Sequence, residues 1–135
     1  MEYVIKPLDS VGHTRNSLKK LQFSSGQDEL DNYIRRYAWT NHQDKRSARV
    51  FVACSTQNPK EIKGYYTSSA SEISIEAIPE ESRRGFPSKL PAILIGRLAV
   101  DKSSQSLGIG KKLLRHAFEC AVEIADKTGI YRDAA

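Results

Sequence analysis

The chain has 135 residues, of which 39% are hydrophobic and 27% are charged, and its formal net charge is +5. These values predict one globular domain over residues 1–135, and the lack of a long apolar run or an N-terminal signal pattern excludes a membrane-spanning or secreted chain. Cys54 and Cys120 lie far apart and in no metal-ligand spacing. This usage predicts a cytoplasmic protein with no disulfide framework and no metal.

The first 41 residues predict a short strand, a loop and a helix. Residues 3–7 have the pattern of a strand that a proline stops, and residues 8–24 have weak periodicity, typical of a loop with a helical turn. From about residue 27 to residue 41, apolar side chains recur at helical spacing. Two acidic residues lie in the first turn of this expected helix, where negative charge is favourable. The expected buried stripe of this helix consists of Leu30, Tyr33, Ile34, Tyr37 and Ala38.

Trp39 falls on the opposite face of this helix, one turn after Arg35, in position to stack on it. Two interpretations stay open: an exposed surface for RNA or a partner protein, or a tryptophan covered by the loop that follows. Basic residues outnumber acidic ones across residues 31–60, which suits a polyanionic partner but also ordinary solubility. The basic residues of this segment are Arg35, Arg36, Lys45, Arg46, Arg49 and Lys60.

The middle of the chain predicts a β-hairpin, a loop and a further strand. Residues 49–54 and 62–74 have strand patterns separated by an Asn-Pro turn. A loop rich in proline follows over residues 79–91 and contains Arg83, Arg84 and Lys89. Residues 91–100 are nearly continuous apolar sequence, as expected of a central strand.

A second long helix is expected from about residue 108 to residue 128, with Gly129 as its C-cap and a new strand starting at Ile130 and Tyr131. The three histidines lack the mutual spacing of a metal site or a catalytic triad and are interpreted as surface residues, with His116 on the polar face of this helix. The expected buried stripe is Leu114, Ala117, Phe118, Ala121, Val122 and Ala125.

The turn between this strand and this helix has the pattern of a diphosphate site. The first turn of a helix has unpaired N–H groups and a positive dipole end, and glycines let the backbone approach an anion. The pattern Gln105-x-x-Gly108-x-Gly110 fits neither a P-loop nor a dinucleotide fingerprint. Glycines that serve only tight packing of the helix on the strand are the alternative.

This pattern resembles the pyrophosphate loop of the GCN5-related N-acetyltransferases (GNAT), which move acetyl from acetyl-CoA to an amine. The element order follows their α/β fold, a mixed sheet flanked by helices. Residues 23–34, 64–67 and 95–101 resemble more specifically the acetyltransferase toxins of bacterial type II toxin–antitoxin systems. The likeness extends from residue 23 to residue 118 and covers most of the chain.

The resemblance implies an enzyme that acetylates the α-amino group of aminoacyl-tRNA, blocks translation, and is neutralised by a ribbon-helix-helix antitoxin that co-represses the operon through operator DNA. Arg35, Arg36, Lys45, Arg46 and Arg49 would then bind tRNA, with Arg97 on the acceptor side. Backbone groups of Leu98, Ala99 and Val100 would hold the acetyl-pantetheine arm. The implied diphosphate-binding N–H groups are those of Gln105, Ser106, Leu107, Gly108, Ile109, Gly110 and Lys111.

The chain departs from the family pattern at its C-terminal end. The family's next strands and its general-acid tyrosine have no counterpart before Ala135, because Tyr131 directly follows the second helix. We therefore expect a GNAT fold without its C-terminal strands, weak catalysis, no assigned catalytic residue, and a homodimer that covers the open sheet edge. Two other functions stay open: a remnant that only binds tRNA, acetyl-CoA or antitoxin, and an acetyltransferase for a small amine or a protein N-terminus.

Overall fold

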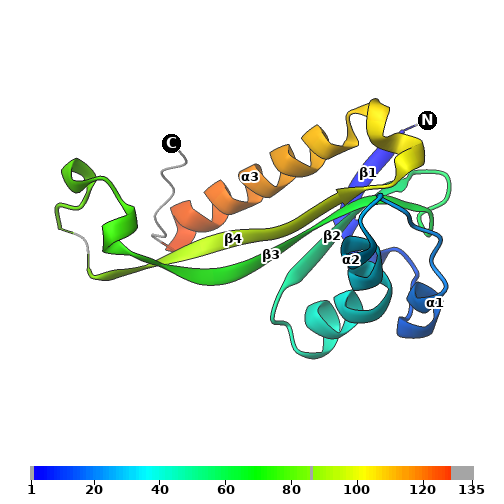
Figure 1. Cartoon of the computed structure of the whole chain (residues 1–135), viewed down its shortest axis with the longest axis horizontal. Helices are drawn as coiled ribbons and strands as arrows, with labels where there is room; N and C mark the ends of the chain where they lie inside the picture. Colours follow the sequence, from blue (N-terminus) through cyan, green and yellow to red (C-terminus); the bar gives the residue numbers. More distant parts are fainter. Residues whose placement is uncertain (1, 86, 129–135) are drawn as a thin grey trace.

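The computed structural model describes residues 2–85 and 87–128. Four antiparallel strands form one sheet in the order β1-β2-β3-β4. Their bounds are β1 Tyr3–Pro7, β2 Arg49–Ser55, β3 Ile62–Ser74 and β4 Lys89–Val100. The short helix α1 (Arg15–Lys19) and the helix that begins with α2 (Asp28–Asn32) lie on one face of the sheet, and α3 (Ile109–Thr128) lies on the other (Figure 1). The expected α/β class is confirmed.

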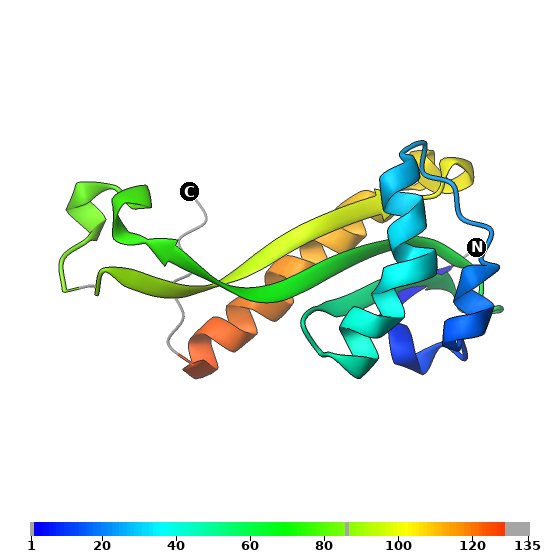
Figure 2. The same cartoon turned by 60° about the horizontal axis from the view of Figure 1, so that its bottom comes forward.

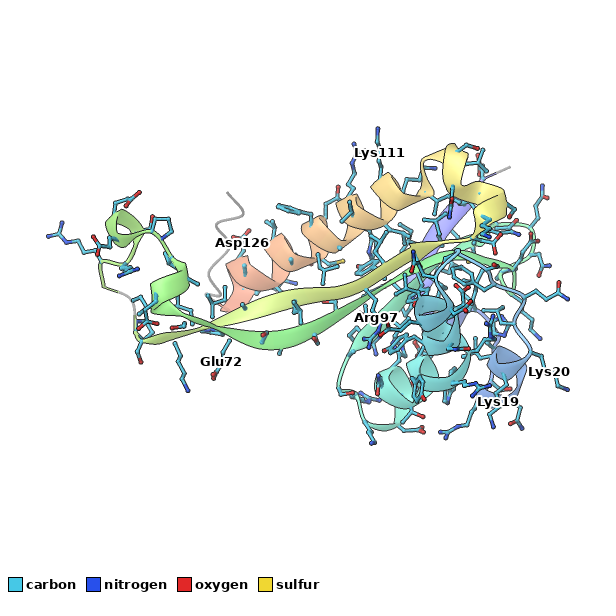
Figure 3. All side chains as sticks on the ribbon, viewed as in Figure 1. Lys19, Lys20, Glu72, Arg97, Lys111 and Asp126 are labelled. Carbon is cyan, nitrogen blue, oxygen red and sulfur yellow. The ribbon has the colours of Figure 1, made fainter. Side chains whose placement is uncertain are left out.

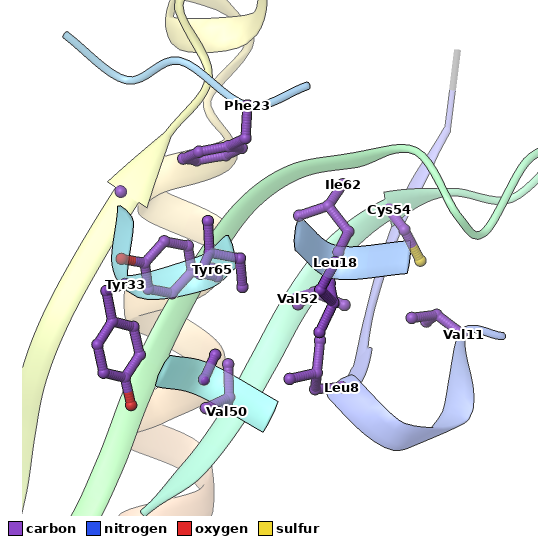
Figure 4. Close-up of a cluster of buried hydrophobic side chains, with 13 residues drawn as sticks. Leu8, Val11, Leu18, Phe23, Tyr33, Val50, Val52, Cys54, Ile62 and Tyr65 are labelled. Carbon is purple, nitrogen blue, oxygen red and sulfur yellow. The ribbon is translucent and has the colours of Figure 1, made fainter. Parts of the chain in front are cut away.

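The two faces of the sheet carry separate cores because successive side chains of a strand point to opposite faces. Val50, Val52 and Tyr65 pack under α1 and the α2 helix, whereas Ala53 and Tyr66 pack under α3. Figure 4 shows Tyr65 among the side chains of the first core. The two adjacent tyrosines of β3 thus fix the two helical layers to opposite faces of the same strand.

The helix that begins with α2 continues to residue 44 and contains two π-helical segments, η2 (Tyr33–Tyr37) and η3 (Thr40–Asp44). A π-helical turn, which i→i+5 hydrogen bonds close, holds about one residue more than an α-helical turn. The side chains that follow are therefore rotated by roughly 100° from the positions that a regular α-helix would give them. Tyr37 is therefore 58% exposed, so its expected place in the buried stripe was wrong, and Trp39 packs half-buried against the core. The remaining stripe residues, Tyr33, Ile34 and Ala38, are buried as expected, and Leu30 is partly buried.

Among the described residues, strand β4 lies at the edge of the four-stranded sheet, whereas its apolar sequence predicted a central strand. Burial alternates at its start, with Lys89 and Pro91 exposed and Leu90 and Ala92 buried, and Leu94 further along is 52% exposed. Beyond the body of the sheet, β3 and β4 continue together as a long hairpin whose tip carries the short helices η4 (Ile75–Ala77) and η5 (Glu80–Ser82) (Figure 2). The expected loop therefore contains helical turns, and β4 begins two residues before the predicted strand.

Helix α3 has the predicted bounds to within a residue, and its buried face was predicted in part, since Ala117 and Ala125 are buried as expected. Ile109, Leu113 and Ala117 are buried on the sheet, whereas Leu114 and Phe118 are more than half exposed. The hydroxyl of Tyr66 lies 2.7 Å from Nδ1 of His116, so this histidine faces the sheet and not the solvent. The predicted C-cap Gly129 and strand start at Ile130 and Tyr131 lie outside the described residues.

His42 is fully buried, which corrects its interpretation as a surface residue. Its Nδ1 accepts a hydrogen bond from the Val50 N–H at 2.8 Å, and its Nε2 lies 2.8 Å from a carboxylate oxygen of Asp9. This arrangement requires a neutral imidazole that donates from Nε2. His42 thus ties the end of the helix to β2 and to the short helix η1 (Leu8–Ser10), which follows β1.

Burial lowers the pKa of His42 despite the opposing effect of Asp9, so the unfolded chain binds a proton first. We expect the free energy of unfolding to fall as the pH drops below about 6.5, the ordinary histidine pKa, and to be insensitive to this group above it. The pKa of Asp9 is also lowered, so that carboxyl titrates below this window. Urea unfolding at pH 7.5 and 5.5 measures the effect.

His42→Leu should flatten this pH dependence while costing about 1–3 kcal/mol at pH 7.5, because the Val50 N–H loses its acceptor. His116→Gln is the matched control, since burial lowers the pKa of His116 as well. The free energy of unfolding of His42→Leu could keep its pH dependence while that of His116→Gln loses it. This result would show that the pH dependence comes from His116 and not from His42.

Candidate functional site

The turn from β4 to α3 is built by one carboxylate and one glycine. Asp101 caps the short helix η6 (Lys102–Leu107) by accepting a hydrogen bond from the Ser103 N–H at 3.0 Å. Burial alone would raise the pKa of Asp101, but hydrogen bonds from Ser103 and Ser24 hold it below its usual value. Gly108 then turns the chain into α3 with a φ of +77°, a conformation that side chains resist.

The surroundings of the glycines decide what they are for. A Cβ on Gly108 would have no atom within 4 Å, and a Cβ on Gly110 would make only an ordinary 3.7 Å contact with Val100. Packing of the helix on the strand therefore does not require either glycine. The packing glycine is Gly64 on β3, where a Cβ would come within 3.0 Å of the Ile109 and Leu113 side chains. The sequence pattern did not predict this role for Gly64.

The N-terminus of α3 is consequently open to solvent and unobstructed. Its first turn presents backbone N–H groups and the positive end of the helix dipole, and the side chains of Lys111 and Lys112 next to it are exposed. Figure 3 shows Lys111 pointing away from the sheet. This is the physical setting in which proteins bind phosphate groups through backbone N–H groups.

Gln105 has a side-chain role that the sequence did not predict. Its amide donates hydrogen bonds to the carbonyl oxygens of Ser25 at 3.0 Å and Val100 at 3.1 Å. Nearby, the Ser24 N–H donates to Asp101 and the Lys102 N–H donates to the Ser24 carbonyl, both at 2.8 Å. The segment before α2 is thereby fixed to the glycine loop, although about 80 residues separate them.

The strand that leads into the loop offers an unpaired edge. Leu98, Ala99 and Val100 pair with β3 on one side. On the other side, no strand of residues 2–85 and 87–128 pairs with β4. The N–H and C=O groups that point to this edge are available to an extended ligand, as at any sheet edge.

A β-bulge at Gly96 separates the two halves of β4. Thr67 pairs with Arg97 and Ser68 with Ile95, so Gly96 is the extra residue. Such a bulge re-aims the side chains beyond it. Ile95 therefore packs on the α3 side of the sheet, whereas the Arg97 guanidinium lies over the Tyr33 ring on the α2 side, 3.9 Å from the ring centroid. Arg97 thus faces α2, as Figure 3 shows.

The basic residues of the first half divide into two groups. Arg35 is half-buried and donates to the carbonyl oxygens of Leu21 and Phe23, so it supports the segment before α2. In the described part of the chain, the cation–π pair is Arg97 with Tyr33 and not the expected Arg35 with Trp39. The other predicted tRNA-binding residues of this half are all exposed: Arg36, Lys45, Arg46 and Arg49.

Known proteins are similar to this chain in sequence and fold. A tRNA-acetylating toxin of Mycobacterium tuberculosis is 38% identical to this chain over 108 residues, which are 80% of this chain and 63% of that protein. The chain therefore spans a little under two thirds of the length of this curated relative. The toxin AtaT, solved in complex with acetyl-methionyl-tRNAfMet, matches with a TM-score of 0.81 at 25% identity, over 96% of this chain and 75% of that chain.

By sequence and fold, the chain is similar to these acetyltransferase toxins. No protein-family model matches it. A variant of AtaT bound to the C-terminus of the antitoxin AtaR and to acetyl-CoA matches with a TM-score of 0.73 at 23% identity, over 97% of this chain and 72% of that chain, which shows the shared fold.

Over residues 2–85 and 87–128, no three His, Cys, Asp or Glu side chains gather as a metal site would require. Within the same residues, no helix is both long and apolar enough to cross a bilayer.

Proposed function

We propose that this chain is an acetyl-CoA-dependent N-acetyltransferase that acts on the α-amino group of aminoacyl-tRNA and thereby blocks translation. The observation that carries the proposal is the open glycine loop: Gly108 and Gly110 are not needed for packing, and they lie at the exposed N-terminus of a long helix. The kinship with a tRNA-acetylating toxin supports the choice of acceptor. The proposal treats residues 1–135 as one acetyltransferase domain acting in the cytoplasm, where aminoacyl-tRNA is found.

The acetyl donor would lie along β4 and end at α3. Leu98, Ala99 and Val100 line the unpaired edge of β4, and those of their backbone groups that do not pair with β3 suit the amide-containing pantetheine arm, which can hydrogen-bond as an added strand. The diphosphate would be bound at the start of α3, where the helix dipole favours an anion. The proposed N–H donors are those of Gln105, Ser106, Leu107, Gly108, Ile109, Gly110 and Lys111.

The reaction needs alignment more than a strong base. An α-amino group has a pKa near 8, so a large share is already neutral and nucleophilic at physiological pH. Its nitrogen would attack the thioester carbonyl carbon, the C–S bond would break, the coenzyme A thiolate would leave, and the amine would lose a proton to solvent. We assign no catalytic side chain, and Tyr131 lies outside the described residues.

The proposed macromolecular partners are aminoacyl-tRNA, a ribbon-helix-helix antitoxin that reaches operator DNA, and a second copy of the chain. A homodimer would cover apolar side chains along β4 and the outer face of α3, which otherwise remain in water. The exposed side chains of β4 and α3 are Leu94, Leu114, Phe118 and Ile124, and Leu107 at the end of η6 is exposed as well.

A single-turnover assay tests the function. The chain is mixed with acetyl-labelled acetyl-CoA and either total aminoacyl-tRNA, the same tRNA after deacylation, a small polyamine, or a peptide with a free N-terminus. We expect label in aminoacyl-tRNA alone. Preferential labelling of the polyamine or peptide would replace the proposed acceptor, and acetyl-CoA and tRNA binding without any transfer would indicate a protein that only binds.

A further inference from the structure

The Arg97 guanidinium ends a stack of planar groups that begins inside the protein. The Tyr65 and Tyr33 rings are stacked at 6.0 Å between centroids with an interplanar angle of 17°. Figure 4 shows these two rings side by side. The Arg97 guanidinium covers the ring of Tyr33, with 3.9 Å between Cζ and the ring centroid. Because Arg97 is exposed, the outer face of its guanidinium is available to one more planar group.

The inner part of this stack is rigid. Tyr33 is 4% exposed, and its hydroxyl accepts a hydrogen bond from the Asn41 amide at 3.0 Å. The Tyr65 hydroxyl donates to the Leu30 carbonyl at 2.7 Å, which fixes the second ring to α2. The protein would therefore lose little conformational freedom when a planar ligand binds to Arg97. Preorganisation of this kind increases affinity.

Tyr37 provides a second planar surface beside this stack. Its ring centroid lies 6.4 Å from that of Tyr33, and its side chain is 58% exposed. The π-helical segment η2 is what turns Tyr37 outward, and π-helical turns occur frequently at functional sites. Tyr37 and Arg97 thus both lie against Tyr33 and are both exposed.

The charges around this surface favour an anionic ligand. Among the described residues, no carboxylate forms an ion pair with Arg97, so its five N–H donors face no competing protein anion. Arg36 is exposed on the same helix as Tyr37. The nearest buried carboxylate, Asp31, instead accepts hydrogen bonds from the Ser25 N–H and hydroxyl.

We propose that Arg97 and Tyr37 form a stacking seat for the unpaired 3′-terminal nucleotide of the RNA acceptor. Single-stranded RNA is recognised by bases stacked on aromatic rings and on guanidinium planes, with nearby cations for the phosphates. Arg97 directly precedes Leu98, the first residue of the proposed pantetheine edge, so the seat adjoins the acetyl donor. This inference rests on the proposed function and names the part of the tRNA that Arg97 contacts.

Fluorescence of a terminal base tests the seat. The probe is a deacylated RNA hairpin with a four-nucleotide 3′ overhang whose last base is 2-aminopurine, and the full chain is titrated into it at low salt. We expect a fluorescence change on binding, because stacking alters the emission of this base. Tyr37→Ala and Arg97→Ala should each weaken binding by roughly 5- to 100-fold, the range for loss of one stacked base.

Conservative variants separate stacking from mere stability. Tyr37→Phe keeps the ring and should bind within about twofold, whereas Arg97→Lys keeps the charge but loses the plane and should abolish the fluorescence change. Arg84→Ala, on the distant hairpin tip, is the control for charge loss and should leave the signal intact. Urea unfolding of each variant shows whether the fold is unchanged.

Three results would overturn the seat: a silent terminal base while the hairpin binds, equal affinity for a blunt hairpin, or full binding by Tyr37→Ala. Each of these leaves the proposed function intact if aminoacyl-tRNA is still acetylated. Absence of both RNA binding and acetylation by the unaltered chain would instead reject the proposed function and the seat together.

Discussion

Gly110→Glu should abolish acetyl-CoA binding while leaving the fold intact. The added carboxylate would lie in the first turn of α3, next to the proposed diphosphate. Repulsion of about 2 to 4 kcal/mol is expected for charges 4–8 Å apart at an effective dielectric constant of about 20, which is roughly a thirtyfold to thousandfold loss of affinity. Titration calorimetry with acetyl-CoA measures it.

Gly110→Glu should lower the affinity for acetyl-CoA without lowering the stability of the fold, so the two effects can be told apart. An acidic side chain at a helix N-terminus is favourable, so the free energy of unfolding should stay equal or rise by a few tenths of a kcal/mol. Gly110→Ala is the matched control, because its Cβ would make only a 3.7 Å contact with Val100. Unchanged acetyl-CoA affinity in Gly110→Glu would show that the anion is bound elsewhere.

Reversal of three exposed charges on and after the helix that begins with α2 should weaken tRNA binding. We expect the combined change of Arg36, Lys45 and Arg49 to Glu to reduce affinity more than about tenfold at low salt. The slope of log affinity against log salt should become shallower by roughly 2 to 3, because fewer counterions are released from the RNA. Filter retention of tRNA over a salt series measures both quantities.

The control reverses the same number of charges elsewhere: Lys20, Arg84 and Lys89 are exposed on α1 and on the distal hairpin. Arg35 is left intact, since its hydrogen bonds to the Leu21 and Phe23 carbonyls make it part of the fold. If both triple variants lose tRNA equally, the excess positive charge acts through the net field of the protein and not through a defined surface.

The antiparallel hairpin of β2 and β3 and the turn into α3 were predictable because their signals are local. Strand alternation, a proline turn and glycines at a helix start act within a few residues of the chain. The bounds of β1, β3 and α3 accordingly agree with the prediction to within a residue. The glycine turn at the start of α3 was also predictable, whereas its diphosphate-binding role stays a prediction.

Which side of a helix is buried was less predictable. Periodicity assigns Tyr37 to the core and Trp39 to the surface only if every turn has the same number of residues, and the π-helical segment η2 breaks that condition. For α3, small and apolar residues occur on more than one side, so the sequence pattern did not distinguish Leu113 from Leu114. Contact with the sheet selected the face.

The sequence by itself determined the order of the elements, the glycine loop, and the kinship that the motifs of residues 23–34 and 95–101 indicated. Only the tertiary structure decided the roles of Gly64, Gln105 and Arg97, because each acts on a partner that is distant in the chain. A β-bulge at Gly96 turns Arg97 toward Tyr33, and neither a bulge nor its direction follows from strand alternation. Local sequence patterns thus predicted the order of the backbone elements, whereas packing between remote segments positions the side chains of the candidate site.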